Sequence, residues 1–488
     1  MKTKIISYLL PGLTSMLFIA AVGGVMLLGN RMINIDGDLP RHILTGRLII
    51  ESRSIPTTEP FIFPYEGRIF TPHEWLTDLL FFSIFTSAGL TGLVAVTAII
   101  IASTFLILYH EIVKQGAMRL PTLMLVIWGL AITSLNWAIR PHAISMLLFM
   151  VWITWADRLA RGEGGRWWKF PLLMLLWVNL HGEFIAGILV LLAYCAGWLW
   201  DYLTDRANSD LRIGKLLLIS LSASLLISPL NPSGIKPWTT ILGFVQNPYL
   251  MSRMQEVNPP NFQQKEFLII LGMLAFSLFI LAIRRRKLLS GRVFLLIGFS
   301  LLALYAARNL HFYGIVAPYV LAVPLSEILA YRVFQRTDEN LKNVELQLKG
   351  YFWPSLVVLL LFLFSFTNRN IYSFSKEIFP VEAIRWLQGN PQKGKMFNDI
   401  NWGGYIESQT WPEEQTFIDS IADPAGELTQ QYENIITTSP DWNKLLEEYD
   451  ISWVIIKPTS LLARELISHP DWELIYHDFT AMIFRRRL

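Results

Sequence analysis

The sequence predicts a mostly α-helical membrane protein, a polytopic bundle of about eleven spans with a C-terminal extracytoplasmic α/β domain. Of its 488 residues, 53% are hydrophobic and only 16% are charged, whereas soluble domains carry about 25% charged residues. Aromatic residues make up 13% of the chain, as expected for belts at the two membrane interfaces. The net charge of +3 gives no indication of nucleic-acid binding, and the single Cys195 excludes an internal disulfide framework.

Apolar runs fill the first three quarters of the chain. The first run follows Lys2 and Lys4 and resembles a signal peptide, but no small-residue cleavage site follows it, so we expect a retained anchor. Several runs are shorter than the ~20 residues of a straight span, so twelve or thirteen spans are alternatives to eleven. The runs are 7–28, 90–110, 120–136, 143–157, 169–180, 184–203, 214–229, 266–283, 292–306, 311–330 and 351–367.

Basic residues predict the sidedness of the spans, because cytoplasmic loops are enriched in Lys and Arg. The basic groups fall on the cytoplasmic side of successive runs only if segment 76–88 is an interfacial or re-entrant helix. If this segment crosses the membrane, the basic loop at Lys114 faces outward, against the rule. The N-terminus is then cytoplasmic, and we expect a multi-pass protein of a bacterial plasma membrane. After Lys2 and Lys4, the groups are Lys114 and Arg119; Arg158, Arg161, Arg166 and Lys169; Arg206, Arg212 and Lys215; Arg284, Arg285, Arg286, Lys287 and Arg292; and Arg332, Arg336, Lys342 and Lys349.

The chain divides at residue 368 into a transmembrane domain, 1–368, with a long first outer loop, 29–89, and a soluble α/β domain, 369–488. In the tail, short apolar runs alternate with helical patterns, as in small α/β domains. We expect strands at Thr416–Ile418, Ile451–Ile456, Leu474–Tyr476 and Ala481–Phe484, and helices at Val381–Gln388, Asn443–Tyr449 and Ser460–Ser468.

An acidic motif, Asp36-Gly37-Asp38-Leu39-Pro40-Arg41-His42, follows the first run directly. Carboxylates beside a bilayer are costly and usually functional, so Asp38, and second Asp36, are candidate catalytic bases. The simpler alternative is that Asp38 only caps the helix that begins near Pro40. Asp38 and His42 are four residues apart and share a face of this helix.

Further polar residues lie at the expected outer ends of spans. Arg308 can bind a phosphate through the planar array of donors on its guanidinium, or its side chain can merely extend to water. Asp38, His42 and Glu183 are candidate ligands for a divalent metal, Mg²⁺ or Mn²⁺, although hydrogen-bonded interfacial residues without a metal are the simpler interpretation. The other candidate site-lining residues are His42, His73, Glu74, His142, His181 and Glu183.

In the tail, Asn401-Trp402-Gly403-Gly404-Tyr405 has the pattern of a tight turn with aromatic anchors. Trp402 and Tyr405 could contact an acceptor, but packing is the simpler use. No Walker loop, dinucleotide fingerprint, nucleophile elbow or zinc spacing occurs, which argues against a nucleotide-driven pump.

The order of these parts resembles the C-type (GT-C) glycosyltransferase superfamily, which includes protein O-mannosyltransferases, lipid A aminoarabinose transferases and the catalytic subunit of oligosaccharyltransferase. The resemblance rests on the acidic motif Asp36 to Asp38, an amphipathic helix from Arg41 to Ser52, a long first outer loop, a second outer turn and a C-terminal outer domain. It implies an inverting transfer of a sugar from a polyprenyl-phosphate donor to a lipid, glycan or protein acceptor at the extracytoplasmic face. Asp38 is then the acceptor-activating base or a metal ligand. The phosphate of the donor is then held by Arg308, with His311 and Arg140.

Two departures limit the resemblance. Arg140-Pro141-His142 stands where such enzymes often carry an acid, which argues against an oligosaccharyltransferase-like metal site. Trp402-Gly403-Gly404-Tyr405 lacks the Asp of the Trp-Trp-Asp motif, so sequon recognition is not implied.

The sequence leaves open a transporter or flippase, a non-catalytic envelope assembly protein, and a ligase that moves whole lipid-linked glycans. A transporter would place ionisable residues near the membrane midplane, often in repeats of broken helices. Here the charged residues are expected at outer ends and no repeat is visible, which favours the transferase.

Overall fold

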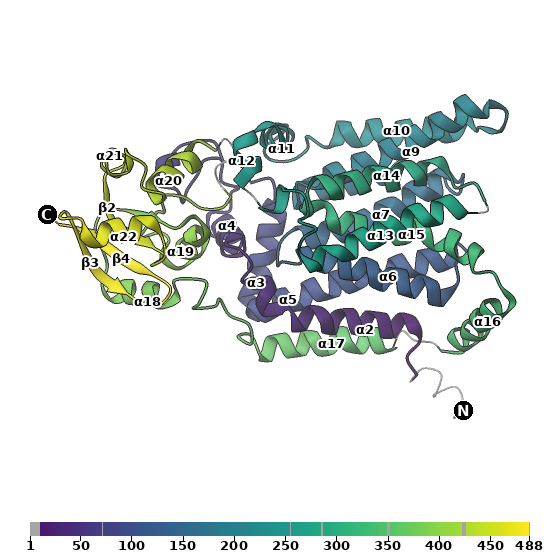
Figure 1. The fold of residues 1–488 in the computed structure, drawn as a ribbon, viewed down its shortest axis with the longest axis horizontal. Coiled ribbons are helices and arrows are strands. Elements are labelled where there is room, and N and C mark those ends of the chain that lie inside the picture. The colour runs from purple at the N-terminus through teal and green to yellow at the C-terminus, as the bar shows by residue number, and fades with distance from the viewer. Residues whose placement is uncertain are drawn as a thin grey trace. The chain divides into compact units, whose positions relative to one another are not determined.

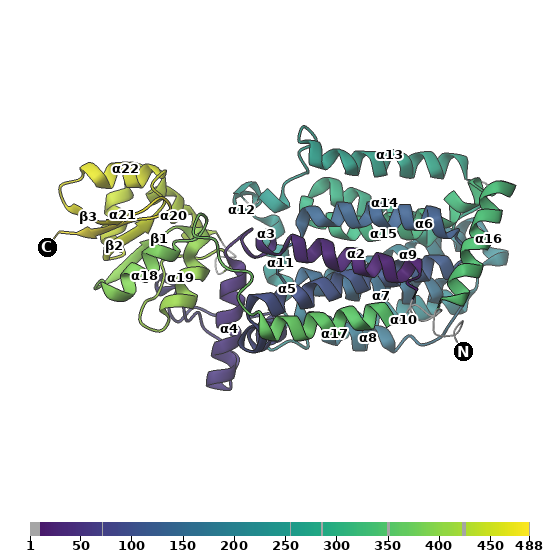
Figure 2. The same cartoon turned by 90° about the horizontal axis from the view of Figure 1, so that it is seen from below.

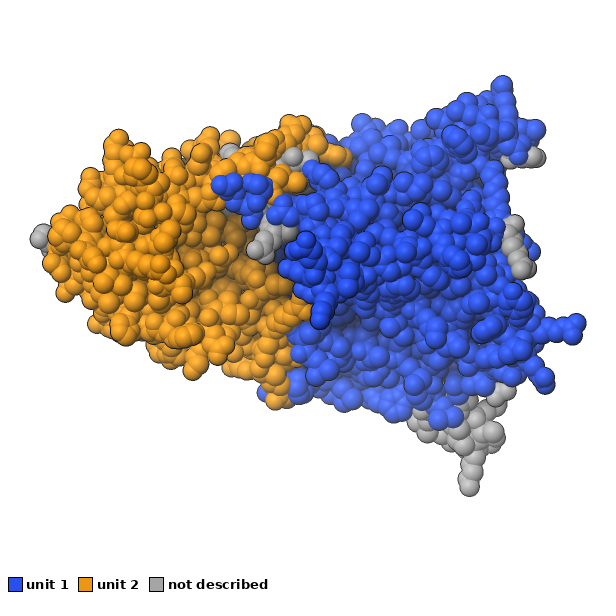
Figure 3. Space-filling model, in the orientation of Figure 1, with its two compact units in different colours: residues 1–28, 94–231, 252–367 blue, residues 29–93, 232–251, 368–488 orange. Residues whose placement is uncertain are grey.

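The computed structural model describes residues 10–70, 72–253, 255–284, 286–348, 352–421 and 426–487. The chain forms two compact units (Figure 3): unit 1 comprises residues 1–28, 94–231 and 252–367, and unit 2 comprises 29–93, 232–251 and 368–488. Unit 2 therefore contains the segment predicted to be the first outer loop together with the C-terminal tail. Lys2, Lys4, Arg285, Lys349 and the first residues of run 7–28 lie outside the described residues.

Unit 1 is a bundle of helices, most of which are apolar (Figure 1). Helices α2 and α17, from the two ends of its sequence, lie side by side in both views (Figures 1 and 2). The helices are α2 (Leu13–Leu27), α6 (Arg119–Thr133), α7 (His142–Ala160), α8 (Lys169–Leu180), α9 (Phe184–Thr204), α10 (Leu211–Ile227), α13 (Leu268–Ile283), α14 (Ser290–Tyr305), α15 (Leu310–Ile328), α16 (Arg332–Gln347) and α17 (Phe352–Thr367). Short 3₁₀ turns occur at η2 (Ser134–Asn136), η3 (Arg206–Asn208), η4 (Gln255–Val257), η5 (Lys265–Phe267) and η6 (Ala307–Asn309).

As far as the chain is described, each predicted apolar run lies on a helix, and the chain is a membrane protein by the length and composition of these helices. Within the described residues, six helical segments are long and apolar enough to cross a membrane: Trp75–Lys114, Arg119–Asn136, His142–Ala160, Phe184–Thr204, Lys265–Ile283 and Ala307–Ile328. Shorter apolar helices include α2, α8, α14 and α17. Eleven spans and their sidedness stay a prediction.

Helix α5 (Trp75–Lys114) joins the predicted segments 76–88 and 90–110, but it is broken at Gly89, where φ is 63° and ψ is −163°. A side chain at Gly89 would also meet the backbone oxygen of Arg369 at 2.4 Å. Thr91 donates to the same oxygen, from its backbone N at 3.4 Å and from Oγ1 at 3.1 Å. Glycine is required here because the φ is positive and the neighbouring backbone is close.

Unit 2 contains a mixed four-stranded sheet in the order β1-β2-β4-β3. Strands β1 (Lys395–Asn398) and β2 (Ile451–Ile456) are parallel, while β4 (Met482–Arg486) pairs antiparallel with both β2 and β3 (Trp472–His477). The helices are α3 (Gly29–Ile33), α4 (Asp38–Ser52), α11 (Lys236–Gln246), α12 (Pro248–Arg253), α18 (Val381–Gly389), α19 (Gly403–Thr410), α20 (Glu427–Ile436), α21 (Trp442–Glu448) and α22 (Leu461–Ser468), with 3₁₀ turns η1 (Phe63–Tyr65) and η7 (Ile400–Trp402).

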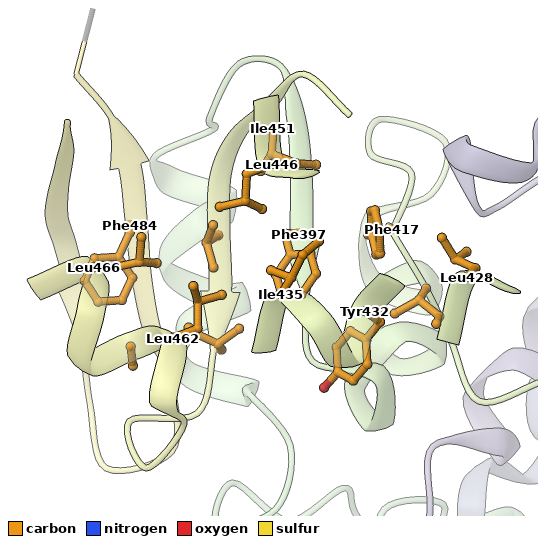
Figure 4. Close-up of a cluster of buried hydrophobic side chains, with 14 of the residues drawn as sticks. Phe397, Phe417, Leu428, Tyr432, Ile435, Leu446, Ile451, Leu462, Leu466 and Phe484 are labelled. Atoms are coloured by element: carbon orange, nitrogen blue, oxygen red, sulfur yellow. The ribbon is translucent and has the colours of Figure 1, made fainter. Parts of the chain in front are cut away.

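Helices cover both faces of this sheet (Figure 2). Helices α20, α21 and α22 pack on one face through the cluster drawn in Figure 4, and α18 and α19 pack on the other. Central strand β2 contributes to both layers, since Val454 and Ile456 face the first and Trp453 and Ile455 the second. Burial on both faces explains why 451–456 is a continuous apolar run.

Three of the four strands expected in the tail form, Ile451–Ile456 with the expected bounds and the other two with bounds shifted by one or two residues. The expected strand Thr416–Ile418 is wrong: Thr416 makes only an isolated bridge to Ile62, and Phe417 donates its backbone N–H to the Asn398 side chain at 2.8 Å. Strand β1, which the sequence analysis missed, lies beside β2 instead.

Candidate active-site clusters

The acidic motif begins helix α4. Asp36 Oδ1 accepts a hydrogen bond from the backbone N of Asp38 at 3.0 Å. The N-cap residue is Gly37, and no side chain caps the helix there. The capping alternative for Asp38 is therefore wrong, and the Asp36 side chain supports the first turn instead. Asp38 Oδ1 accepts a hydrogen bond from Ser420 Oγ at 2.5 Å.

His42, one turn further along α4, is held by a buried carboxylate. Its Nδ1 lies 2.6 Å from Asp78 Oδ1, and both residues are buried. Its Nε2 lies 3.7 Å from Glu74 Oε2, and His73 Nε2 lies 3.6 Å from Glu74 Oε1. The structure thus brings together the predicted His42, His73 and Glu74, and adds Asp78, which the sequence analysis missed within segment 76–88.

The carboxylates around His42 make it a cation at neutral pH. Burial alone lowers the pKa of His42, but the nearby charges of Asp78, Glu74 and Asp38 outweigh it and raise this pKa to about 9. The imidazolium of His42 is therefore a positive charge among the carboxylates of Asp78, Glu74 and Asp38.

Arg41 is the centre of a buried ion cluster in unit 2. Its Nη2 donates to Glu59 Oε1 at 2.8 Å, and its Nη1 lies 2.8 Å from Glu407 Oε2 and 2.9 Å from Asp419 Oδ2. The guanidinium also stacks over the Phe61 ring, 4.1 Å from its centroid. Arg41 is only 1% exposed, so one cation faces three carboxylates with almost no water to screen them.

The excess of carboxylates changes the titration of Glu407. Burial raises the pKa of Glu407 to about 7; the charge of Asp419 adds to this shift, while Arg41 opposes it. The folded protein therefore favours the protonated carboxyl, and this stabilisation is complete below the ordinary pKa of 4.5 and is lost as the pH rises through about 7.

We therefore expect unit 2 to lose stability between about pH 5 and 8, and Glu407→Gln to reduce that loss, because the amide stays neutral. Thermal unfolding of the full chain in detergent at pH 5, 6, 7 and 8 measures this loss of stability. Glu51→Gln, a substitution at an exposed glutamate, is the control. Parallel pH curves for wild type and Glu407→Gln would contradict the assignment.

Unit 1 holds a second polar cluster, formed by the helix ends at His142, His181, Glu183 and His311. Glu183 Oε2 lies 3.3 Å from both His181 Nδ1 and His311 Nε2. Ser145 Oγ lies 2.8 Å from His181 Nδ1 and accepts a hydrogen bond from Trp177 Nε1 at 2.8 Å. The rings of His142 and His311 have centroids 5.8 Å apart. All four predicted residues are therefore brought together.

Two ring nitrogens of this cluster lack partners. Nε2 of His142 and Nδ1 of His311 are buried and make no hydrogen bond with any described residue. Buried polar atoms are nearly always hydrogen-bonded, so these two nitrogens are suited to a ligand's polar atoms.

The two arginines predicted for the donor phosphate differ in their surroundings. Arg140 Nη1 pairs with Glu256 Oε2 at 3.0 Å, so its charge is already balanced. Arg308 lies in η6, directly before α15, and is half-buried. Among the described residues, no hydrogen bond or ion pair engages its guanidinium. Arg308 is thus the better anion ligand of the two.

The described residues do not fit the metal site expected from Asp38, His42 and Glu183. Asp38 Oδ1 is engaged by Ser420 and His42 Nδ1 by Asp78, while Glu183 pairs with histidines in unit 1. Nowhere in the described ranges do three or more His, Cys, Asp or Glu side chains form a metal-binding group. We therefore derive no step through a metal.

Trp402 and Tyr405 belong to the core of the C-terminal domain. Trp402 is 1% exposed, and its Nε1 donates to the backbone oxygen of Ile378 at 2.8 Å. Tyr405 is 5% exposed and packs against Phe379. Burial corrects the acceptor-side assignment of these two rings, and packing, the simpler use, accounts for both.

Comparison with known proteins supports the fold. No protein-family model and no curated protein matches the sequence. Among solved structures, the oligosaccharyltransferase of Archaeoglobus fulgidus in its apo form matches with a TM-score of 0.56 and 11% identity, over 90% of this chain and 69% of that one. The same enzyme, AglB, in complex with an inhibitory peptide and a dolichol-phosphate gives the same values. Its form tethered to an acceptor peptide with the NVT sequon gives a TM-score of 0.57 and 12% identity, over 90% and 68% of the two chains. This chain therefore shares the fold of the archaeal oligosaccharyltransferase over most of its length.

Proposed function

We propose that this protein is an integral-membrane glycosyltransferase that moves a sugar from a polyprenyl-phosphate donor to an acceptor at the extracytoplasmic face. The observation that carries the proposal is the fold shared over 90% of the chain with AglB, one solved complex of which contains a dolichol-phosphate. A lipid phosphate is the leaving group of a polyprenyl-phosphate sugar, so this chemistry suits the proposed donor.

Asp38 is the base that takes the proton of the acceptor. Its carboxylate lies on the first turn of α4, and Oδ1 accepts a hydrogen bond from the neutral hydroxyl of Ser420. The imidazolium of His42, one turn further along α4, is fixed by Asp78. General bases of this kind contribute about 10²- to 10⁴-fold to rate.

The donor phosphate binds to the unit 1 cluster. Arg308 brings a guanidinium with no carboxylate partner in the described part of the chain, and His142 and His311 bring two unpartnered ring nitrogens. Negative charge develops on the phosphate as the sugar leaves, so these donors stabilise the transition state more than the ground state. A single displacement at the sugar carbon inverts its configuration.

The proposal is tested with purified full-length protein and a panel of radiolabelled polyprenyl-phosphate sugars, presented with lipid, glycan and peptide acceptors. Transfer from at least one donor, with an inverted product, is the expected result. If no donor is consumed and labelled donor only moves across reconstituted vesicles, the protein is a flippase and the proposal is wrong.

Arg308→Ala is expected to lower kcat/KM for the donor by about a hundredfold, since two charge-assisted hydrogen bonds to the phosphate are lost. Arg308→Lys keeps the positive charge but lacks the paired donors of the guanidinium, so this variant is expected to retain only part of the activity. Arg166→Ala, at an exposed arginine of unit 1, is the control. Equal activity of Arg308→Ala and Arg166→Ala would exclude Arg308 from the donor site.

A further inference from the structure

The C-terminal domain packs directly against the acidic motif. Helix α19 packs against α4, and their backbones touch at glycines. A side chain at Gly37 would meet the backbone oxygen of Asn401 at 2.3 Å, and one at Gly404 would meet the backbone oxygen of Gly37 at 2.6 Å. The two glycines are therefore needed for this close approach, which gives Gly404 of the Trp402-Gly403-Gly404-Tyr405 motif a structural use.

Asp419 also holds the start of α4, through an ion pair with Arg41. Asp419 Oδ2 lies 2.9 Å from Arg41 Nη1, and Asp419 Oδ1 accepts the backbone N–H of Ile421 at 2.9 Å. Arg41 is three residues beyond Asp38 on α4, and Ser420 directly follows Asp419. Two contacts therefore join these segments: the hydrogen bond from Ser420 to Asp38 and the ion pair between Asp419 and Arg41. Together they fix the position of the Ser420 hydroxyl.

We propose that Ser420 is a positioning residue for Asp38. By donating its hydroxyl proton to Asp38 Oδ1 at 2.5 Å, it fixes the orientation of the carboxylate that takes the acceptor proton. An aspartate on the first turn of a helix otherwise samples several rotamers, and only some of them place an oxygen within reach of a bound hydroxyl or amide. The inference rests on the proposed function, in which Asp38 is the base.

The test uses the full-length protein and compares Ser420→Ala, Ser420→Thr and Ser408→Ala. Ser408 is the matched control, because it lies in α19 and its hydroxyl donates to the Tyr405 backbone at 2.8 Å. We expect Ser420→Ala to lower kcat about tenfold with the donor KM unchanged. Ser420→Thr keeps a hydroxyl and restores most of kcat, and Ser408→Ala behaves like wild type.

A second measurement does not depend on activity. Carbodiimide coupling of glycine ethyl ester labels accessible carboxylates, and tandem mass spectrometry assigns the label to Asp38 or Asp36. Ser420→Ala is expected to raise labelling of Asp38 severalfold over Ser408→Ala and to leave Asp36 unchanged, because only Asp38 loses a donor.

The two measurements separate the two proposals. Unchanged Asp38 labelling together with wild-type kcat in Ser420→Ala overturns the positioning role, as does an equal kcat loss in Ser420→Ala and Ser420→Thr. Raised Asp38 labelling in a protein that transfers no sugar from any donor supports the positioning role and overturns the proposed function alone.

Discussion

Asp38→Asn is expected to lower kcat for sugar transfer by about a thousandfold, within the range of general-base contributions, while the KM for the donor stays constant. Asparagine has the size of aspartate and can still accept the hydrogen bond from Ser420. Helix α4 and its packing against α19 should therefore be preserved. The amide oxygen cannot take up the acceptor's proton at neutral pH. Steady-state rates with the best donor of the panel measure the effect.

Asp36→Asn is the matched control. Asp36 supports the first turn of α4 by accepting the Asp38 backbone N–H, and an amide oxygen does the same, so we expect rates near wild type. If Asp36→Asn abolishes transfer and Asp38→Asn does not, Asp36 is the base. Full activity in both variants would remove the acidic motif from the mechanism.

Arg41→Met is expected to destabilise unit 2 by about 3–5 kcal/mol, because removing one partner of a buried ion cluster leaves the opposite charges unpaired. Methionine fills much of the space of the aliphatic part of the arginine side chain. The loss of stability therefore arises mainly from the missing charge and less from a cavity. Three carboxylates, of Glu59, Glu407 and Asp419, would remain in a site with little water. The urea dependence of proteolysis of unit 2, followed in the full-length protein, measures the change.

Arg47→Met, in the same helix, is the control. Arg47 pairs with Glu51 at 2.7 Å, but both side chains are about half exposed, and such pairs contribute less than about 1 kcal/mol. Arg41→Met should also be less harmful near pH 5, where the carboxylates can protonate. A loss equal to that of Arg47→Met would mean that the ion cluster does not stabilise unit 2.

Local patterns predicted much of the fold. In the described part of the chain the predicted apolar runs lie on helices, as expected for the long apolar stretches of a membrane protein, and Ile451–Ile456 is a strand because both of its faces are covered. Strand β1 was not predicted, since Lys395–Asn398 is short and mixed in character. Thr416–Ile418 is apolar and buried like a strand, but its backbone is bonded to a side chain.

The candidate clusters were predicted where their residues lie at the expected outer ends of spans or one turn apart on the same helix. Asp38 and His42 could be paired by their spacing along α4, whereas Asp78 comes from another helix. The ion cluster of Arg41 was not anticipated at all, because Glu407 lies 366 residues away along the chain. No periodicity in a single sequence reports such a contact, and it depends on the tertiary fold.

That separation has a consequence for biosynthesis. A ribosome adding about 5–20 residues per second needs roughly twenty to seventy seconds to extend the chain by the 366 residues between Arg41 and Glu407. During this time the guanidinium has only Glu59 of its three carboxylates available, and most of the intervening apolar helices must enter the bilayer first. The first outer loop is therefore expected to stay open to proteases and chaperones until the end of translation, so truncated chains that lack the C-terminal domain should be cleaved within residues 29–70.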